Sequence, residues 1–138
     1  MTDKPRYVKP LPRLDEESRG WWEALARHEL YVQRCGQCGT TRLPPRAVCP
    51  RCLSSAIEWV RASGRATVYS CTVTRQNQMP GFREELPYVL AIVELEEGPR
   101  IMTNVVGCEP DAVRIGMPVV VEFEDVTPEI TLPKFRPA

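Results

Sequence analysis

Cys35-Gly36-Gln37-Cys38-Gly39 and Cys49-Pro50-Arg51-Cys52 are two C-x-x-C hooks separated by ten residues. Two residues between thiols allow one tight turn to direct both sulfurs at a single ion, and such turns favour glycine and proline. Two hooks supply four thiolates, which complete the tetrahedral shell that Zn²⁺ prefers, at about 2.3 Å per bond. The sequence therefore predicts a zinc site formed by Cys35, Cys38, Cys49 and Cys52.

The predicted zinc is structural rather than catalytic, because four thiolates leave no open position for water or substrate. A ribbon of about 30 residues also needs such a staple, since it cannot close a core alone. Iron in a rubredoxin-like site is the alternative, because the C-x-x-C-G and C-P-x-C pieces resemble that knuckle pair. An electron-transfer role is disfavoured, since the ribbon lacks the aromatic shell around the rubredoxin site.

The other candidate chemical groups give poor support for a self-contained enzyme. Cys71 and Cys108 fall in predicted strand and strand-end positions, where a free thiol usually acts as a small apolar group. A nucleophilic cysteine would need a basic partner, and neither has one nearby in the sequence. His28 is the only histidine, so no Ser-His-Asp or H-x-x-x-H arrangement exists. We therefore predict no catalytic residue.

Around the cysteine module, the pattern predicts one helix and a small barrel. Asp15 can cap a helix that runs to about His28. From Trp59 onward, alternating β-branched and apolar residues predict four strands, at 66–74, 88–95, 100–106 and 119–123. Four or five curved strands with a helical turn at 109–115, in about 70 residues, fit an OB-type barrel better than a sandwich.

We therefore expect a mainly β chain with an N-terminal helix, a rubredoxin-like zinc ribbon and a small OB-fold β-barrel. The expected segments are an arm and helix at 1–29, the ribbon at 30–58, the barrel at 59–126 and an extended, Pro-rich tail at 127–138.

Charge and cysteine usage bound the location and the partners. Lys plus Arg equal Asp plus Glu at 18 each, but the segment from Leu30 to Arg65 holds six arginines against Glu58 alone. From Glu84 to Glu129 there are eleven acids. No apolar run approaches the roughly 20 residues of a membrane span. The first twelve residues are charged and Pro-rich, unlike a secretory signal. We expect a cytoplasmic protein, with six reduced or metal-bound cysteines and no membrane contact.

An ordered series of short motifs resembles one protein family. The motifs are LYVQRC at 30–35, CG at 38–39, LPPR at 43–46, CPRC at 49–52, Trp59, SGRATVYS at 63–70, PYV at 87–89, VEL at 93–95 and IGMPV at 115–119. Together they look like the zinc-ribbon plus OB-fold proteins, long a family of unknown function, which are encoded beside thiolases and called acyl-CoA-associated. The similarity spans about residues 15 to 125.

This resemblance implies a non-catalytic accessory subunit for a thiolase-fold enzyme, in a hetero-oligomer. The implied partner is a thiolase, a hydroxymethylglutaryl-CoA synthase or a lipid-transfer-type aldolase of steroid side-chain breakdown. The small protein would scaffold the complex or complete its acyl-CoA channel. The catalytic cysteines and histidines of thiolases have no counterpart in this chain, so the chemistry would belong to the partner.

Three arginines of the ribbon, Arg42, Arg46 and Arg51, are the candidates for contacting the phosphates of coenzyme A. Guanidinium groups grip phosphate through paired hydrogen bonds. A solvated basic surface, or a face for an acidic partner, is an equally open interpretation.

Two further groups are candidates for partner or channel contacts. The loop 76–86 is long for a small barrel, and loops of that kind are often functional. Ordinary loop packing is the alternative. Adjacent tryptophans on the predicted helix cannot easily both be buried, and tryptophan is enriched at interface centres. Packing onto the ribbon is equally open. The candidate residues are Trp21, Trp22, Met79, Phe82, Arg83 and Tyr88.

The competing function is single-stranded nucleic-acid binding, which zinc ribbons and OB barrels serve elsewhere. The acidic barrel segment argues against it, because it would repel a phosphate backbone. The first predicted strand also offers only Tyr69 as a stacking platform, where single-strand binders usually present several aromatics.

Overall fold

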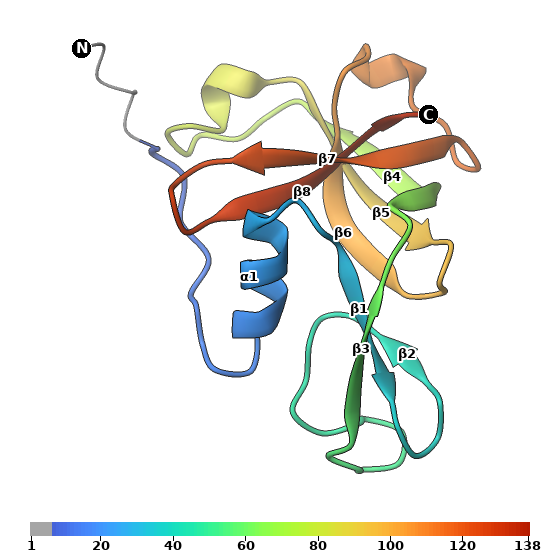
Figure 1. Ribbon diagram of the computed structural model, residues 1–138. Coiled ribbons are helices and arrows are strands. Elements are labelled where there is room, and N and C mark those ends of the chain that lie inside the picture. Colours follow the sequence, from blue (N-terminus) through green and yellow to red (C-terminus); the bar gives the residue numbers. More distant parts are fainter. Residues whose placement is uncertain (1–6) are drawn as a thin grey trace.

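The computed structural model describes residues 7–138, which form one helix, a three-stranded ribbon sheet and a closed five-stranded barrel (Figure 1). The first six residues of the predicted arm lie outside the described residues. The helix α1 spans Arg19–Ala26, and two short 3₁₀ turns, η1 and η2, span Arg83–Glu85 and Pro110–Ala112. The predicted fold class is confirmed.

The ribbon sheet has the order β2-β1-β3, with β1 at Tyr31–Cys35, β2 at Thr41–Arg42 and β3 at Ile57–Arg61. Both neighbours pair antiparallel with β1. The register places Cys35 opposite Ile57 at the far end of the sheet, where the cysteine knuckles lie. The ribbon therefore projects from the barrel, as Figure 1 shows.

The barrel closes in the order β4-β5-β6-β8-β7, and β7 pairs back onto β4. Its strands are β4 at Arg65–Thr74, β5 at Tyr88–Leu95, β6 at Arg100–Val105, β7 at Pro118–Asp125 and β8 at Thr131–Pro137. A bulge between Val68 and Ser70 interrupts the register of β4 with β5. Such a bulge bends a long strand, which closure of a small barrel requires.

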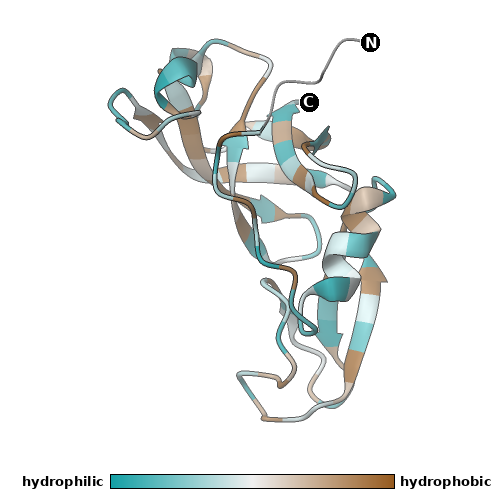
Figure 2. Ribbon diagram, turned by 90° about the vertical axis from the view of Figure 1, so that its left-hand side faces the viewer, coloured by the Kyte–Doolittle hydropathy of each residue, from teal (hydrophilic) through white to brown (hydrophobic). Residues whose placement is uncertain are grey.

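Alternation along the strands, clearest in β5, builds the core, and Figure 2 shows hydrophobic and hydrophilic positions following one another along the strands. Every second residue of β5, from Val89 to Leu95, is buried. Phe135 of β8 is fully buried in the same core. Leu25 of the helix and Val32 of the ribbon belong to that cluster too. One continuous apolar core therefore joins the helix, the ribbon and the barrel.

The C-terminal segment corrects one expectation. We expected residues 127–138 to form an extended tail beyond a barrel that ends at 126. The segment is extended, but Thr131–Pro137 is the strand β8, which pairs antiparallel with β7 from Val119↔Pro137 to Asp125↔Thr131. The barrel therefore includes the C-terminal residues.

The helix starts later than predicted. Asp15 does act as a capping group, because its carboxylate accepts bonds from the backbone N–H and the hydroxyl of Ser18 at 2.8 and 2.7 Å. However, these bonds stabilise a turn at 16–18, and the α-helix begins only at Arg19. It ends at Ala26, and His28 follows with a positive φ of 59°.

Candidate metal centre

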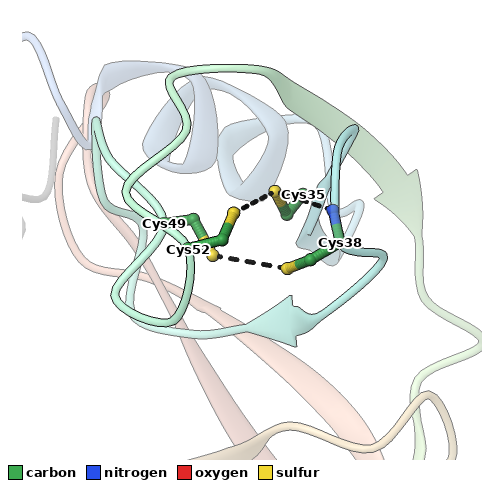
Figure 3. A group of neighbouring side chains, drawn as sticks. All are labelled: Cys35, Cys38, Cys49 and Cys52. Carbon is green, nitrogen blue, oxygen red and sulfur yellow. Dashed lines mark hydrogen bonds between the residues drawn. The ribbon is translucent and has the colours of Figure 1, made fainter.

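Four cysteine side chains meet at the tip of the ribbon, and their sulfurs all lie within 4.8 Å of one another (Figure 3). The Sγ atoms of Cys35 and Cys52 are 3.5 Å apart, and those of Cys38 and Cys49 are 3.7 Å apart. Tetrahedral zinc with bonds of about 2.3 Å would place its sulfurs about 3.8 Å apart. The four predicted ligands therefore form a cage of the size that zinc requires.

Both hooks have the same backbone geometry. In the first, Gly39 N–H donates to the carbonyl of Cys35 at 2.9 Å, and Gly39 has a φ of 76°. In the second, Leu53 N–H donates to the carbonyl of Cys49 at 2.9 Å, and Leu53 has a φ of 64°. Glycine takes this left-handed conformation without steric cost, whereas leucine does not. The second hook therefore holds a strained residue directly after its last ligand.

The ligand thiols influence one another strongly. Backbone N–H groups of Cys38 and Gln37, each 3.4 Å from the sulfur, lower the pKa of Cys35. The hydroxyl and then the backbone of Thr40 lower the pKa of Cys38 to about 6. A backbone bond from Ser54 lowers the pKa of Cys52, but the Cys35 thiol and burial oppose it, and the pKa is raised to about 12. Zinc binds the thiolate form of cysteine, so metal binding at this cage would release the protons that the thiols carry.

The cage has no position for a reactant. Cys35 and Cys49 are buried, Cys52 is half-buried, and Cys38 faces solvent. A metal bound by four thiolates has a complete tetrahedral shell, so it can neither bind nor activate water. The centre can brace the ribbon, whose strand β2 spans only Thr41–Arg42.

The three arginines predicted to contact coenzyme A do not share one environment. Arg46 and Arg51 are exposed, but Arg42 is only 6% exposed. Its Nη2 donates to the carbonyl of Arg46 at 3.2 Å, while Nε and Nη1 are buried without a partner among the described residues. Arg42 therefore braces the loop 43–46 from within, and of the three candidates only Arg46 and Arg51 offer a guanidinium group at the surface.

A cavity of about 540 Å³ lies beside the loop 76–86 and the barrel. Phe82 and Tyr88 line it, with ring centroids 6.1 Å apart, and Lys9 lies over the Phe82 ring at 5.1 Å. Met79 is exposed and outside this lining, and Arg83 pairs with Glu84 at 3.0 Å. The structure therefore brings Phe82 and Tyr88 together, but not Met79 or Arg83.

Trp21 and Trp22 meet edge to face, with centroids 4.8 Å apart. Both are half-buried and line a second cavity, of about 350 Å³, against β6 and β8. Sequence reasoning missed the barrel residues on the other walls, chiefly Leu90, Met102 and Leu132. The apolar run of β5 carried a signal for this wall. Side chains of a strand alternate between two faces, so a nearly continuous apolar run places apolar residues such as Leu90 on the outer face as well as in the core.

The remaining candidates are structural. Cys71 and Cys108 are half-buried and pack against the core. The guanidinium of Arg100 lies 3.7 Å from the Tyr69 ring, so the stacking platform that nucleic-acid binding would need is covered on that face. No described helix has the length and apolar character to cross a bilayer.

Two family models match the chain. Residues 22–58 match the description "ChsH2, rubredoxin-like zinc ribbon domain", and residues 59–124 match "ChsH2, C-terminal OB-fold domain". Together with the four-cysteine cage, the ribbon match confirms the prediction of structural zinc.

Similar proteins fall into two groups. A probable enoyl-CoA hydratase alpha subunit of Thermomonospora curvata is 45% identical over 98% of this chain, but the chain spans only 42% of that protein. A 3-oxo-4,17-pregnadiene-20-carboxyl-CoA hydratase alpha subunit of Mycobacterium tuberculosis is 37% identical, and the chain spans 36% of it. A DUF35 domain-containing scaffold protein of Methanocaldococcus jannaschii is 38% identical over 86% of this chain and 84% of its own.

A solved structure agrees closely. A chain of the Ltp2-ChsH2(DUF35) aldolase superimposes with a TM-score of 0.83 and 45% identity, over 92% of this chain and 98% of that one. A DUF35 protein of unknown function from Sulfolobus solfataricus, 16% identical with a TM-score of 0.62, shares the fold.

Proposed function

Because the chain belongs to the ChsH2 family, in which a rubredoxin-like zinc ribbon precedes an OB-fold domain, we propose that it is a non-catalytic accessory subunit of an acyl-CoA enzyme. Its partner in this proposal is a thiolase-fold enzyme. The candidate partners of that class are a thiolase, a hydroxymethylglutaryl-CoA synthase and a lipid-transfer-type aldolase of steroid side-chain breakdown.

One observation carries the proposal. The likeness to the Ltp2-ChsH2(DUF35) aldolase covers 98% of the matched chain, and the name of that aldolase joins Ltp2 to ChsH2. The scaffold protein of Methanocaldococcus jannaschii supports the same role, since this chain spans most of its length. The hydratase subunits are more than twice as long as this chain, so their activity supports only the link to acyl-CoA.

The chemistry of the described residues fits a non-catalytic subunit. The zinc cage is saturated, so the metal offers no Lewis-acid site. His28, the one histidine, is bound to Asp125 through Nε2 at 2.9 Å and stacks on Phe123. An imidazole held in this way on the surface of a hairpin serves to join α1 to β7. The reacting groups would therefore come from the partner.

Two surfaces could serve acyl-CoA in the complex. Exposed Arg46 and Arg51 carry guanidinium groups that suit the phosphates of coenzyme A. The cavity beside Phe82 and Tyr88 is large enough for part of an acyl or pantetheine chain. In this proposal the chain scaffolds the partner or completes its acyl-CoA channel.

The proposal predicts the identity of the partner. The tagged chain, expressed in its native host and purified at moderate ionic strength, should retain a thiolase-fold enzyme in a stable hetero-oligomer. Mass spectrometry of the co-purified proteins checks this. Recovery of other proteins but none of the thiolase class would contradict the proposal.

The proposal also predicts that the zinc-loaded chain alone shows no thiolysis, hydrolysis or aldol cleavage of any acyl-CoA. A thiol-release assay measures this, with the reconstituted complex as the positive control. Turnover by the isolated chain above the uncatalysed rate would show that the chain has a reaction site of its own.

A further inference from the structure

The barrel is closed by very few bonds along one seam, between β6 and β8. These strands run parallel and share a single register pair, Val105↔Phe135, whereas β6 pairs with β5 along its whole length. The cavity of about 350 Å³ lies in this seam, between residues 101–104 of β6 and residues 132–134 of β8. Trp21 and Trp22 of α1 line it as well. We call this cavity the gap of the seam, and it lies beside the part of β6 that shares no register pair with β8.

The backbone of Met102 is directed into this gap. Leu95 N–H donates to the carbonyl of Pro99 at 2.9 Å, which fixes the phase of the β5–β6 ladder. Bonded and non-bonded pairs alternate in an antiparallel ladder, so Ile101 and Thr103 bond to β5. Met102, between them, directs its N–H and C=O to the opposite side, toward the seam.

A bond at the other end of β6 fits the same alternation of backbone directions. Val106 N–H, four positions after Met102, donates to the carbonyl of Phe135 on β8 at 2.8 Å. At Met102 itself β8 offers no ladder partner, because the register pairs of the two strands are confined to Val105↔Phe135. Met102 therefore directs one donor and one acceptor away from β5 and outside the register pairs of β6 with β8, and edge groups of this kind form a template for pairing with another chain.

The β8 side of the gap is closed to pairing. Pro133 has no N–H, and its carbonyl already accepts the hydroxyl of Thr103 at 2.8 Å. A strand entering the seam would therefore bond to β6 and not to β8. Because Pro133 cannot pair and Met102 can, an added strand would pair with β6 at Met102.

The lining side chains define the chemistry of the occupant. Trp21, Trp22, Leu90, Ile101 and Leu132 make the walls mainly apolar, and the side chain of Met102 is 66% exposed at the rim. Lys134 is the one charged group among the lining residues, and its Nζ is already bound to the side chain of Asn104 at 2.6 Å. The occupant should therefore be apolar, with an extended backbone that supplies one acceptor and one donor to Met102.

Taking the proposed function as the premise, we propose that an extended apolar segment of the partner subunit adds as a strand to the free edge of β6 at Met102. Its side chains would fill the cavity beside Trp21 and Trp22. In strand addition, main-chain bonds supply affinity and pockets for alternate side chains supply specificity, and the seam offers both.

The first test uses amide hydrogen exchange of the zinc-loaded full chain. In the free chain, the Met102 amide should exchange at least tenfold faster than the amides of Ile101 and Thr103, which are bonded to β5. In the complex, its exchange should slow at least tenfold. Slow exchange of the Met102 amide in the free chain, or no slowing in the complex, would overturn the proposal.

The second test separates the backbone from the side chain. Met102→Pro removes the edge N–H without removing a bond to β5, whereas Met102→Ala removes the side chain and keeps that N–H. Strand addition predicts at least a tenfold weaker complex for Met102→Pro, and a change of less than threefold for Met102→Ala. Equal effects of the two variants would contradict it. Melting temperature and zinc content of both variants check the fold, and amide exchange decides the question if the proline variant does not fold.

The seam and the proposed function fail in different ways. The identity of the co-purified enzyme tests the function, whereas the Met102 measurements test the seam in whichever complex the wild-type chain forms. A partner of another enzyme class, together with a protected Met102 amide, would contradict the proposed function and support strand addition at β6. A thiolase-fold partner, together with an unprotected Met102 amide, would contradict strand addition and support the proposed function. A wild-type chain that forms no complex would contradict both.

Discussion

Gly64 lies where the ribbon meets the barrel, and its position leaves no room for a side chain. Its φ is 86°, and a Cβ built there would lie 2.7 Å from Cγ1 of Val121. The carbonyl of Gly64 also accepts the N–H of Val121 at 2.8 Å. Close approach of the two backbones therefore depends on the missing side chain.

We expect Gly64→Ala to destabilise the chain more than its matched control, Gly116→Ala. Gly116 has nearly the same φ, 88°, but nothing lies within 4 Å of a Cβ built there. The control should lose about 1–2 kcal/mol from the left-handed backbone alone. Gly64→Ala should lose about 1–3 kcal/mol more from overpacking. Urea unfolding of the zinc-loaded proteins measures both, and equal losses would contradict the close contact.

Single residues differ in how far the sequence predicts them. The four ligands were predictable because a C-x-x-C hook encodes its geometry locally, in two residues and a turn. Arg42 was not, because its burial depends on pairing with Gln33 across the ribbon and on the loop 43–46 folding over it. A guanidinium group carries no local signal that separates a surface ligand from an internal brace.

Among the elements, β8 shows why proline misleads a strand prediction. Pro133 and Pro137 fall inside it, and proline cannot donate to a ladder. Proline is tolerated where the missing N–H faces away from a partner strand. Pro133 meets this condition at the seam with β6, so the same residue hides the strand in the sequence and closes one side of the gap in the structure.

We expect Phe135→Ala to destabilise the barrel by about 3–5 kcal/mol, because it removes a fully buried aromatic from the core. Phe82→Ala is the matched control, since Phe82 is half-buried in the loop before η1 and outside the core cluster. Phe82→Ala should lower the free energy of unfolding far less than Phe135→Ala does. Thermal unfolding followed by circular dichroism compares them. A loss below 1 kcal/mol for Phe135→Ala would mean that the C-terminal segment is a loose tail.

Strands with strong alternation were predicted almost to the residue. Tyr88–Leu95 was predicted with the same bounds, and the predicted 66–74 begins one residue late. The helix was less predictable, because Asp15 stabilises a turn before Arg19 instead of the first helical turn. A capping residue indicates that a turn begins, but not whether the turn continues as a helix.

At the scale of the molecule, the two charge blocks of the sequence partly neutralise each other. Arg65 at the start of the barrel pairs with Glu96 at 2.8 Å, and the backbone N–H of Ser63 binds Glu97 at 2.9 Å. Within the basic block itself, Arg34 pairs with the one acid of that block, Glu58, at 2.9 Å. Exposed pairs of this kind contribute at most about 1 kcal/mol each. They orient the junction, whereas Arg46 and Arg51 stay available to a partner.

The order of the modules was predictable from the motifs, but their mutual placement was not. Leu25, Val32 and the barrel residues share one cluster, which no local pattern encodes. The seam likewise depends on the crossing of two strands far apart in sequence, β6 and β8. Partner surfaces arise at this scale, and for that reason Met102 escaped the sequence interpretation.

The account rests on a saturated zinc cage that braces the ribbon and leaves the metal without a reactant position. Amide exchange of the purified chain before and after zinc removal by a chelator tests this most directly. We predict that the amides of β1 and β3, from Tyr31–Cys35 and Ile57–Arg61, lose their protection when zinc leaves, while those of β5 keep most of theirs. A ribbon equally protected after complete loss of the metal would contradict the account.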